Sequence, residues 1–97
     1  MNMTANITKI REFQEFNGTH MRVQVTEEFV IVSNADGLSS GVYFLNHELE
    51  RLRYFTYPSL KEAPYNLEVY EDPETTTLQV FVASPDSISI IEHIKSR

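Results

Sequence analysis

The chain has 97 residues, of which 41% are hydrophobic and 23% are charged, and it contains no cysteine. This length allows one domain with a modest core, and the lack of cysteine excludes disulfides, thiol chemistry and cysteine-ligated metal. The net charge of −6 is unevenly distributed, because no lysine or arginine occurs from Glu62 to Ile94, where seven acids fall. Such an acidic surface repels nucleic acid and membrane headgroups and attracts basic partners.

We expect no targeting signal in the first residues. Residues 1–5 lack the basic start and apolar core of a signal peptide, and we expect them to be frayed. No apolar run approaches the roughly 20 residues of a membrane span. We therefore expect a cytoplasmic chain whose residues 1–97 form a single domain without a membrane partner.

Residues 7–16 are predicted to form a short amphipathic helix, since apolar side chains recur every three positions and Asn17-Gly18 would end it. Residues 21–26 alternate apolar and polar side chains, which predicts a strand with one solvent-exposed face. Phe29–Val32 is apolar on both faces, so we expect a central strand covered on both sides. A long loop and a short strand at 42–45 follow.

Residues 46–55 are predicted to form a second helix. Asn46 is a favourable N-cap, two glutamates follow in the first turn, and two arginines lie near the end. Leu49, Leu52 and Phe55 would form its buried stripe.

The C-terminal third is predicted to contain strands at 67–71 and 76–83, joined by a type I turn at Asp72-Pro73. Ser84-Pro85-Asp86 matches the start of a helix, with Ile88, Ile91 and Ile94 facing inward. The alternative for this last segment is a strand through Ile88 and Ile90.

The expected fold class is α+β, with a five-stranded antiparallel sheet, helices on one face and the order α-β-β-β-α-β-β-α. The second face would still present apolar residues that a partner copy could cover, so we predict a homodimer; these are Val30, Val32, Tyr70 and Phe81. The element order is similar to that of class I type III secretion chaperones, small acidic dimers that bind unfolded effector segments. The similarity is in order alone and covers no motif.

Sequence motifs give no support for an enzyme. The G-x-S-x-G pattern at 37–41 precedes a predicted strand, whereas a hydrolase nucleophile needs a strand-to-helix turn. His20, His47 and His93 lack metal-ligand spacing, and no cofactor motif occurs. The basic-aromatic cluster around Arg51 is too small for a phosphate-binding footprint in a protein of net charge −6. We predict no metal, no cofactor and no direct nucleic-acid binding.

The candidate partner surface combines tyrosines with the acids of the C-terminal hairpin. Tyrosine is frequent at interface hot spots, and turn acids are solvated unless they serve recognition. The predicted partner-binding residues are Tyr57, Tyr65, Glu68, Glu71, Asp72 and Glu74.

These features predict a non-catalytic, acidic protein-binding module that engages a basic partner as an inhibitor, chaperone or adaptor. The alternative is a DNA mimic that inhibits a nucleic-acid-binding protein, such as a phage or mobile-element anti-defence protein. Salt separates the two, because the affinity of a mimic falls steeply with salt.

Overall fold

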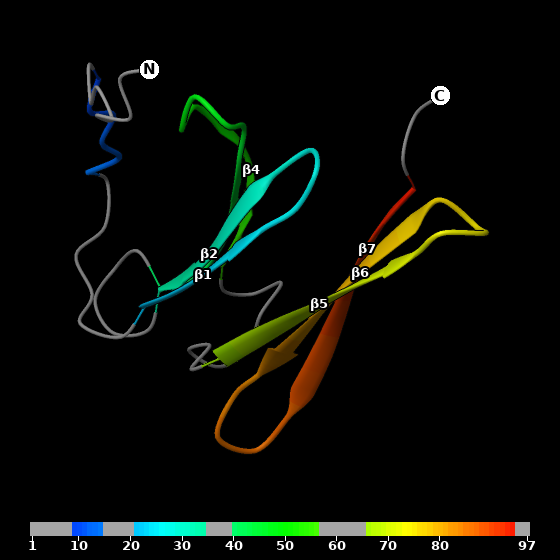
Figure 1. Cartoon of the computed structure of the whole chain (residues 1–97). Coiled ribbons are helices and arrows are strands. Elements are labelled where there is room, and N and C mark those ends of the chain that lie inside the picture. The colour runs from blue at the N-terminus through cyan, green and yellow to red at the C-terminus, as the bar shows by residue number, and fades with distance from the viewer. Residues whose placement is uncertain (1–8, 15–20, 35–39, 57–65, 95–97) are drawn as a thin grey trace, which may run out of the picture.

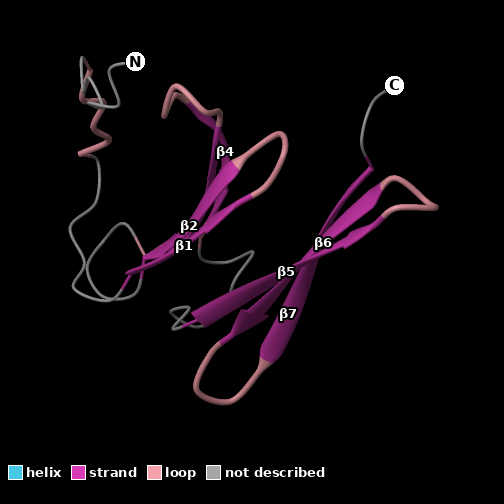
Figure 2. Ribbon diagram, viewed as in Figure 1, coloured by secondary structure: helices cyan, strands magenta, loops and turns pink. Residues whose placement is uncertain are grey.

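The computed structural model describes residues 9–14, 21–34, 40–56 and 66–94. Within these ranges the chain forms seven strands and no helix, so the α+β prediction is wrong and the described fold is all-β (Figures 1 and 2). The strands are β1 (Met21–Val25), β2 (Val30–Asn34), β3 (Gly41–Leu45), β4 (Arg51–Phe55), β5 (Asn66–Asp72), β6 (Thr77–Ala83) and β7 (Ile88–Ile94).

The strands form two antiparallel sheets, one of four strands in the order β1-β2-β3-β4 and one of three strands in the order β5-β6-β7. Figure 1 shows the sheets as two separate layers. Each sheet is a meander, in which neighbours in sequence are neighbours in space. β1 lies against β5, so these two edge strands meet where the layers join.

The main core lies between the sheets and follows from the alternation of side chains along each strand. In β6, for example, Leu78, Val80 and Val82 are buried while the residues between them are not. Burying each large apolar side chain contributes about 1.5–3 kcal/mol. The buried members of this core are Phe29, Ile31, Val42, Phe44, Leu67, Leu78, Val80 and Val82.

A second, smaller cluster lies on the outer face of the four-stranded sheet. Val32, Tyr43 and Leu45 are buried there, with Phe13 packed against them. The rings of Phe13 and Tyr43 are 6.3 Å apart, and Arg11 Nε lies 2.8 Å from Glu48 Oε2. The segment 9–14 therefore covers part of this face. It is not helical, and the rest of the helix predicted over 7–16 falls outside the described residues.

The helix predicted over 46–55 is wrong, because Asn46 caps a hairpin turn. The Asn46 amide donates to the Glu50 carbonyl and the Leu49 amide donates to the Asn46 carbonyl, both at 2.9 Å. Asn46 Oδ1 accepts the amides of Glu48 and Glu50, also at 2.9 Å. Leu49 has a φ of 64°, which a right-handed helix does not allow. Asparagine caps turns and helices by the same kind of bond, so its presence alone does not distinguish them.

The predicted apolar stripe of that helix is divided between the two faces of the sheet. Phe55 faces the main core, where its ring lies 6.0 Å from that of Phe44. Leu49 packs against the cluster on the opposite face. Tyr54 stacks on Tyr43 across the β3–β4 pair at 5.5 Å, which is a cross-strand contact and not a helical one.

The helix predicted from Ser84 is also wrong, and the alternative of a strand through Ile88 and Ile90 is confirmed. The Ser84 amide donates to the Ser87 carbonyl at 3.0 Å, with Pro85 and Asp86 at the centre of the turn. Proline suits the second position of a β-turn as well as the first position of a helix. The β-branched isoleucines that follow favour the strand.

The five predicted strands correspond in position to β1, β2, β3, β5 and β6, while β4 and β7 replace two helices. The order α-β-β-β-α-β-β-α is therefore wrong, and the similarity in order to secretion chaperones no longer applies.

Gly41, the last glycine of the G-x-S-x-G pattern, is the first residue of strand β3 and is required there by packing. A Cβ at this position would overlap the Phe55 carbonyl and lie 2.7 Å from Thr56 Cγ2.

Thr76→Gly is predicted to stabilise the fold. Thr76 has a φ of 56° in the β5–β6 turn, and a non-glycine residue in this region costs about 1–3 kcal/mol. After the entropy cost of glycine, we expect a gain of about 1 kcal/mol in the free energy of unfolding. Denaturant unfolding measures it, with Thr75→Gly in the same turn as the control. An equal gain in both variants would contradict the assignment of strain to Thr76.

Candidate protein interface

The structure describes four of the six predicted partner-binding residues. Tyr57 and Tyr65 lie outside the described residues, as does Ser39 of the G-x-S-x-G pattern. Glu68 and Asp72 belong to the outer face of β5, since they alternate with the buried Leu67 and its neighbours.

The other two predicted acids lie elsewhere. Glu71 falls on the inner face of β5, where it pairs with Leu78 and is partly buried. Glu74 is exposed in the β5–β6 turn. Of the four described acids, only Glu68 and Asp72 share a face, so the described residues do not bring the predicted acids together in one cluster.

Asp72 has a structural function in its turn. Its Oδ1 accepts the Glu74 amide at 2.9 Å. That bond, with smaller contributions from the Thr75 side chain and backbone, lowers the pKa of Asp72 against a weaker opposing effect of burial. The carboxylate therefore closes the β5–β6 hairpin.

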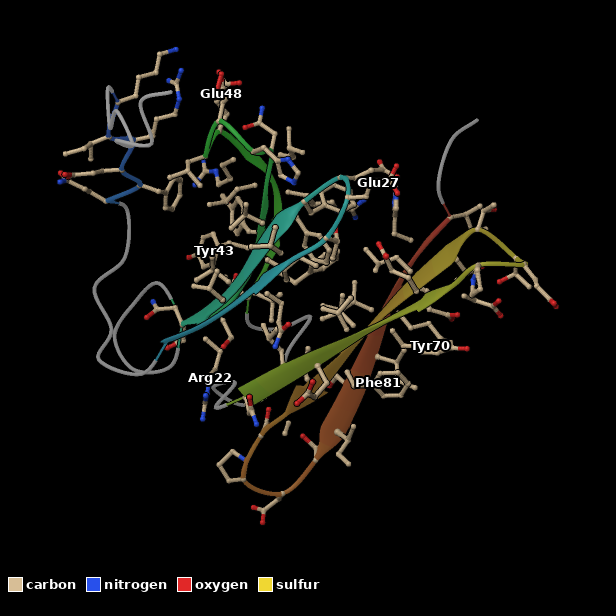
Figure 3. All side chains as sticks on the ribbon, viewed as in Figure 1. Arg22, Glu27, Tyr43, Glu48, Tyr70 and Phe81 are labelled. Atoms are coloured by element: carbon tan, nitrogen blue, oxygen red, sulfur yellow. The ribbon has the colours of Figure 1, made fainter. Side chains whose placement is uncertain are left out.

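The outer face of the three-stranded sheet carries large apolar side chains. Tyr70 and Ile90 are each 53% exposed, and Ile88 and Ile94 are each 74% exposed. Figure 3 shows Tyr70 and Phe81 on the side that faces away from the four-stranded sheet. The outer apolar face is defined as Tyr70, Phe81, Ile88, Ile90 and Ile94.

The register places acids among these apolar residues. Glu68, Phe81 and Ile90 form one row across the three strands, and Tyr70, Gln79 and Glu92 form the next. Gln79 Nε2 donates to Glu92 Oε2 at 3.1 Å, which orients that carboxylate. Residues 66–94 contain six acids and no lysine or arginine. The outer apolar face therefore belongs to a uniformly acidic sheet.

A groove of about 230 Å³ opens between β4 and β7, on the flank opposite the β1–β5 contact. We call it the flank groove, and its lining residues are Phe29, Phe44, Leu52, Arg53, Phe55, Ile91, Glu92 and His93.

The base of the flank groove is aromatic and its rim is charged. The rings of Phe29 and His93 meet edge to face at 5.0 Å, and Arg53 lies 4.9 Å from the centre of the Phe55 ring. His93 Nε2 is 3.7 Å from Glu28 Oε2, which is an ion-pair distance when the imidazole is protonated. The groove therefore combines an apolar interior with charges of both signs at its edge.

The described histidines occupy structural positions. His47 Nε2 lies 2.8 Å from the Thr26 carbonyl and so links the β3–β4 turn to the β1–β2 turn. His93 packs on Phe29, and His20 lies outside the described residues. Among the residues that the structure describes, no three His, Asp or Glu side chains gather as a metal site. No helix in the described ranges is long and apolar enough to cross a membrane.

Comparison with protein-family models, with curated proteins and with solved structures finds no match to this chain. Any functional assignment therefore depends on the surface itself, since a fold alone does not specify a function.

The outer apolar face was not predicted from the sequence, because Ile88–Ile94 was expected to be part of a helix and is a strand. The available signal was the alternation of Ile88 and Ile90 with serine, together with a high content of β-branched residues.

The stability contributed by Asp72 is predicted to depend on pH. Because the folded-state pKa lies below the unfolded value, the carboxylate stabilises the fold above the unfolded pKa of about 4, and this contribution is lost as pH falls through the folded pKa. Asp72→Asn should therefore lower Tm at pH 7 and have a progressively smaller effect as pH falls below about 4. Thermal unfolding across this range tests it, and Asp86→Asn controls for net charge. A constant difference between Asp72→Asn and wild type at all pH values would contradict the prediction.

Proposed function

We propose that this chain is a non-catalytic protein-binding module that engages a basic partner through the outer apolar face of its three-stranded sheet. The observation that carries the proposal is the exposure of Tyr70, Ile88, Ile90 and Ile94 on a sheet with six acids and no lysine or arginine. Contiguous exposed apolar residues with a polar rim are typical of interaction surfaces.

The two kinds of side chain would contribute differently to binding. Burying the isoleucines and Tyr70 removes apolar area from water, which is favourable by about 25 cal/mol of free energy for each Å² buried. Tyrosine is also frequent among interface hot spots. Glu68 and Glu92 flank these residues and would steer a basic partner, which mainly raises the association rate. A basic protein with an apolar patch fits both features.

The outer face of the four-stranded sheet supports this proposal less well. Phe13 packs on it, and Arg11 forms an ion pair with Glu48 at its border. Arg51 lies 4.7 Å from the centre of the Tyr54 ring, so positive charge is also present. This face is partly covered by the chain itself and does not select a basic partner.

The DNA-mimic alternative receives no specific support from the geometry. A mimic presents carboxylates at phosphate-like positions, whereas Phe81 and Gln79 of β6 lie between Glu68 and Glu92 here. Salt dependence still distinguishes the two functions: a mimic that replaces six or more phosphates should lose about a thousandfold in affinity between 50 and 200 mM salt.

A double variant tests the proposed face. We expect Tyr70→Ser with Ile90→Ser to reduce capture of a basic protein from the native host by about tenfold or more, as loss of two anchors implies. Val23→Ser with Val25→Ser is the matched control, because these valines are 58% and 68% exposed on the other sheet. Quantitative mass spectrometry of affinity-captured proteins measures both. The proposal is wrong if every captured protein responds equally to the two variants or if the protein lost is acidic.

The homodimer stays a separate prediction. Light scattering at micromolar concentration tests it, and a single species at the chain mass of 11.2 kDa would contradict it.

A further inference from the structure

We propose that the open edge of β7 receives an extended segment of the basic partner as an additional strand, with one large apolar side chain of that segment in the flank groove. This inference rests on the proposed function and names how the partner binds. The recognised chemistry is a peptide that alternates apolar and basic side chains.

The first support is that β7 has few of the features that normally protect an edge strand, with Glu92 as its one acid. It has seven residues, contains no lysine or proline, and pairs with β6 from Ile88 to Ile94 without a bulge. Among the described residues, no strand pairs with its other side. A long, regular edge of this kind is a template for strand addition.

The other edges differ in ways that limit strand addition. β4 has five residues, carries Arg51 and Arg53, and pairs with β3 through a bulge at Phe44/Leu45. β1 and β5 lie against each other. Among the described edges, β7 is therefore the one best suited to receive a strand.

The turn before β7 fixes which backbone groups are available. The Ser84 amide donates to the Ser87 carbonyl, so the Ser84–Ser87 pair is hydrogen-bonded within the hairpin. Hydrogen-bonded pairs alternate along an antiparallel ladder. The amide and carbonyl groups of Ile88, Ile90, Glu92 and Ile94 are therefore directed away from β6, towards the open edge.

The flank groove gives the inward side chain a site. Ile91 faces the main core between its neighbours on the outer face, and it lines the flank groove together with Phe29 and Phe44. A residue added beside Ile91 would point the same way, because side chains alternate in register across a sheet. The volume of about 230 Å³ and the apolar base suit a leucine or phenylalanine side chain.

Charge selects the neighbouring residues of the segment. A residue added beside Glu92 would lie on the outer face next to that carboxylate, and residues 66–94 offer no lysine or arginine that would compete for it. Lysine or arginine is the complementary choice. On the core-facing side of β7, Glu28 Oε2 lies 3.7 Å from His93 Nε2 at the rim of the flank groove. The Glu28 carboxylate adds to the negative potential there. Arg53 lies on the opposite, β4 side of the groove.

The probe is a labelled synthetic octapeptide of alternating lysine and leucine, and fluorescence polarisation measures its binding. Its control is the same peptide N-methylated at every amide, which keeps the charge but leaves no N–H group on either edge of the peptide to donate to β7. We expect the control to bind at least about tenfold more weakly.

A second experiment keeps the unmethylated octapeptide and compares two protein variants, Ile90→Pro and Ile90→Thr. Both remove the isoleucine side chain, but only proline removes the amide directed to the open edge, and proline is tolerated at such edge positions. We expect Ile90→Pro to bind the octapeptide about tenfold more weakly than Ile90→Thr, with both variants folded by circular dichroism. Leu52→Ser, at the groove wall, should also weaken binding.

The outcomes separate this inference from the proposed function. Equal binding of the two peptides by wild type overturns strand addition, even if Ile90→Pro fails to fold. Equal binding by the two Ile90 variants overturns it while the capture experiment with Tyr70→Ser and Ile90→Ser can still support the outer apolar face. A third outcome concerns a second copy of the chain. If the protein is a dimer that Ile90→Pro dissociates and Ile90→Thr leaves intact, the β7 edge pairs with a second copy, and the assignment of that edge to a partner segment is overturned.

Discussion

The interior between the two sheets determines which residues remain outside. Leu78, Val80 and Val82 pack there against Ile31 and the aromatic residues of the four-stranded sheet. Since side chains alternate along a strand, burying these three residues of β6 directs Phe81 and its cross-strand neighbours away from the core. A slip of one residue in the register of β6 would exchange the two sets. The outer apolar face is therefore a direct consequence of how the core is packed.

The same constraint explains the shape of the flank groove. The sheets are in contact at β1 and β5, and the opposite flank between β4 and β7 is lined by side chains that belong to the core or border it. Phe29 and Phe44 are buried core residues that also form the base of the groove. A ligand side chain in this position would extend the existing core, and it would need no new apolar surface from the protein.

The local sequence was sufficient for the five strands that show alternation or continuous apolar runs between turn residues. It was insufficient for β4 and β7, because Asn46 and Ser84-Pro85-Asp86 use chemistry shared by helix starts and β-turns. What decided these segments was pairing with β3 and β6, which is not visible in a short window of sequence. The left-handed backbone of Leu49 is a further example, since its side chain packs into a cluster that only the folded sheet creates.

The candidate surface was predictable in its charge and not in its shape. The absence of lysine and arginine from residues 66–94 is evident from the sequence, and the fold concentrates those acids in one sheet. The apolar component depends on β7 being a strand, so it was missed together with that strand. Glu71 shows the remaining difficulty, because adjacent residues in a strand face opposite sides and a run of acids is divided between them.

The open edge of β7 also has a consequence for the protein when the proposed partner is not bound. Ile88–Ile94 has four isoleucines, one acid and no proline, a composition that suits stacking into cross-β fibrils. Crowded, unliganded molecules thus have a route to aggregation that strand addition would block. If the proposed partner pairs with this edge, its supply would limit how much of the protein is left free to aggregate.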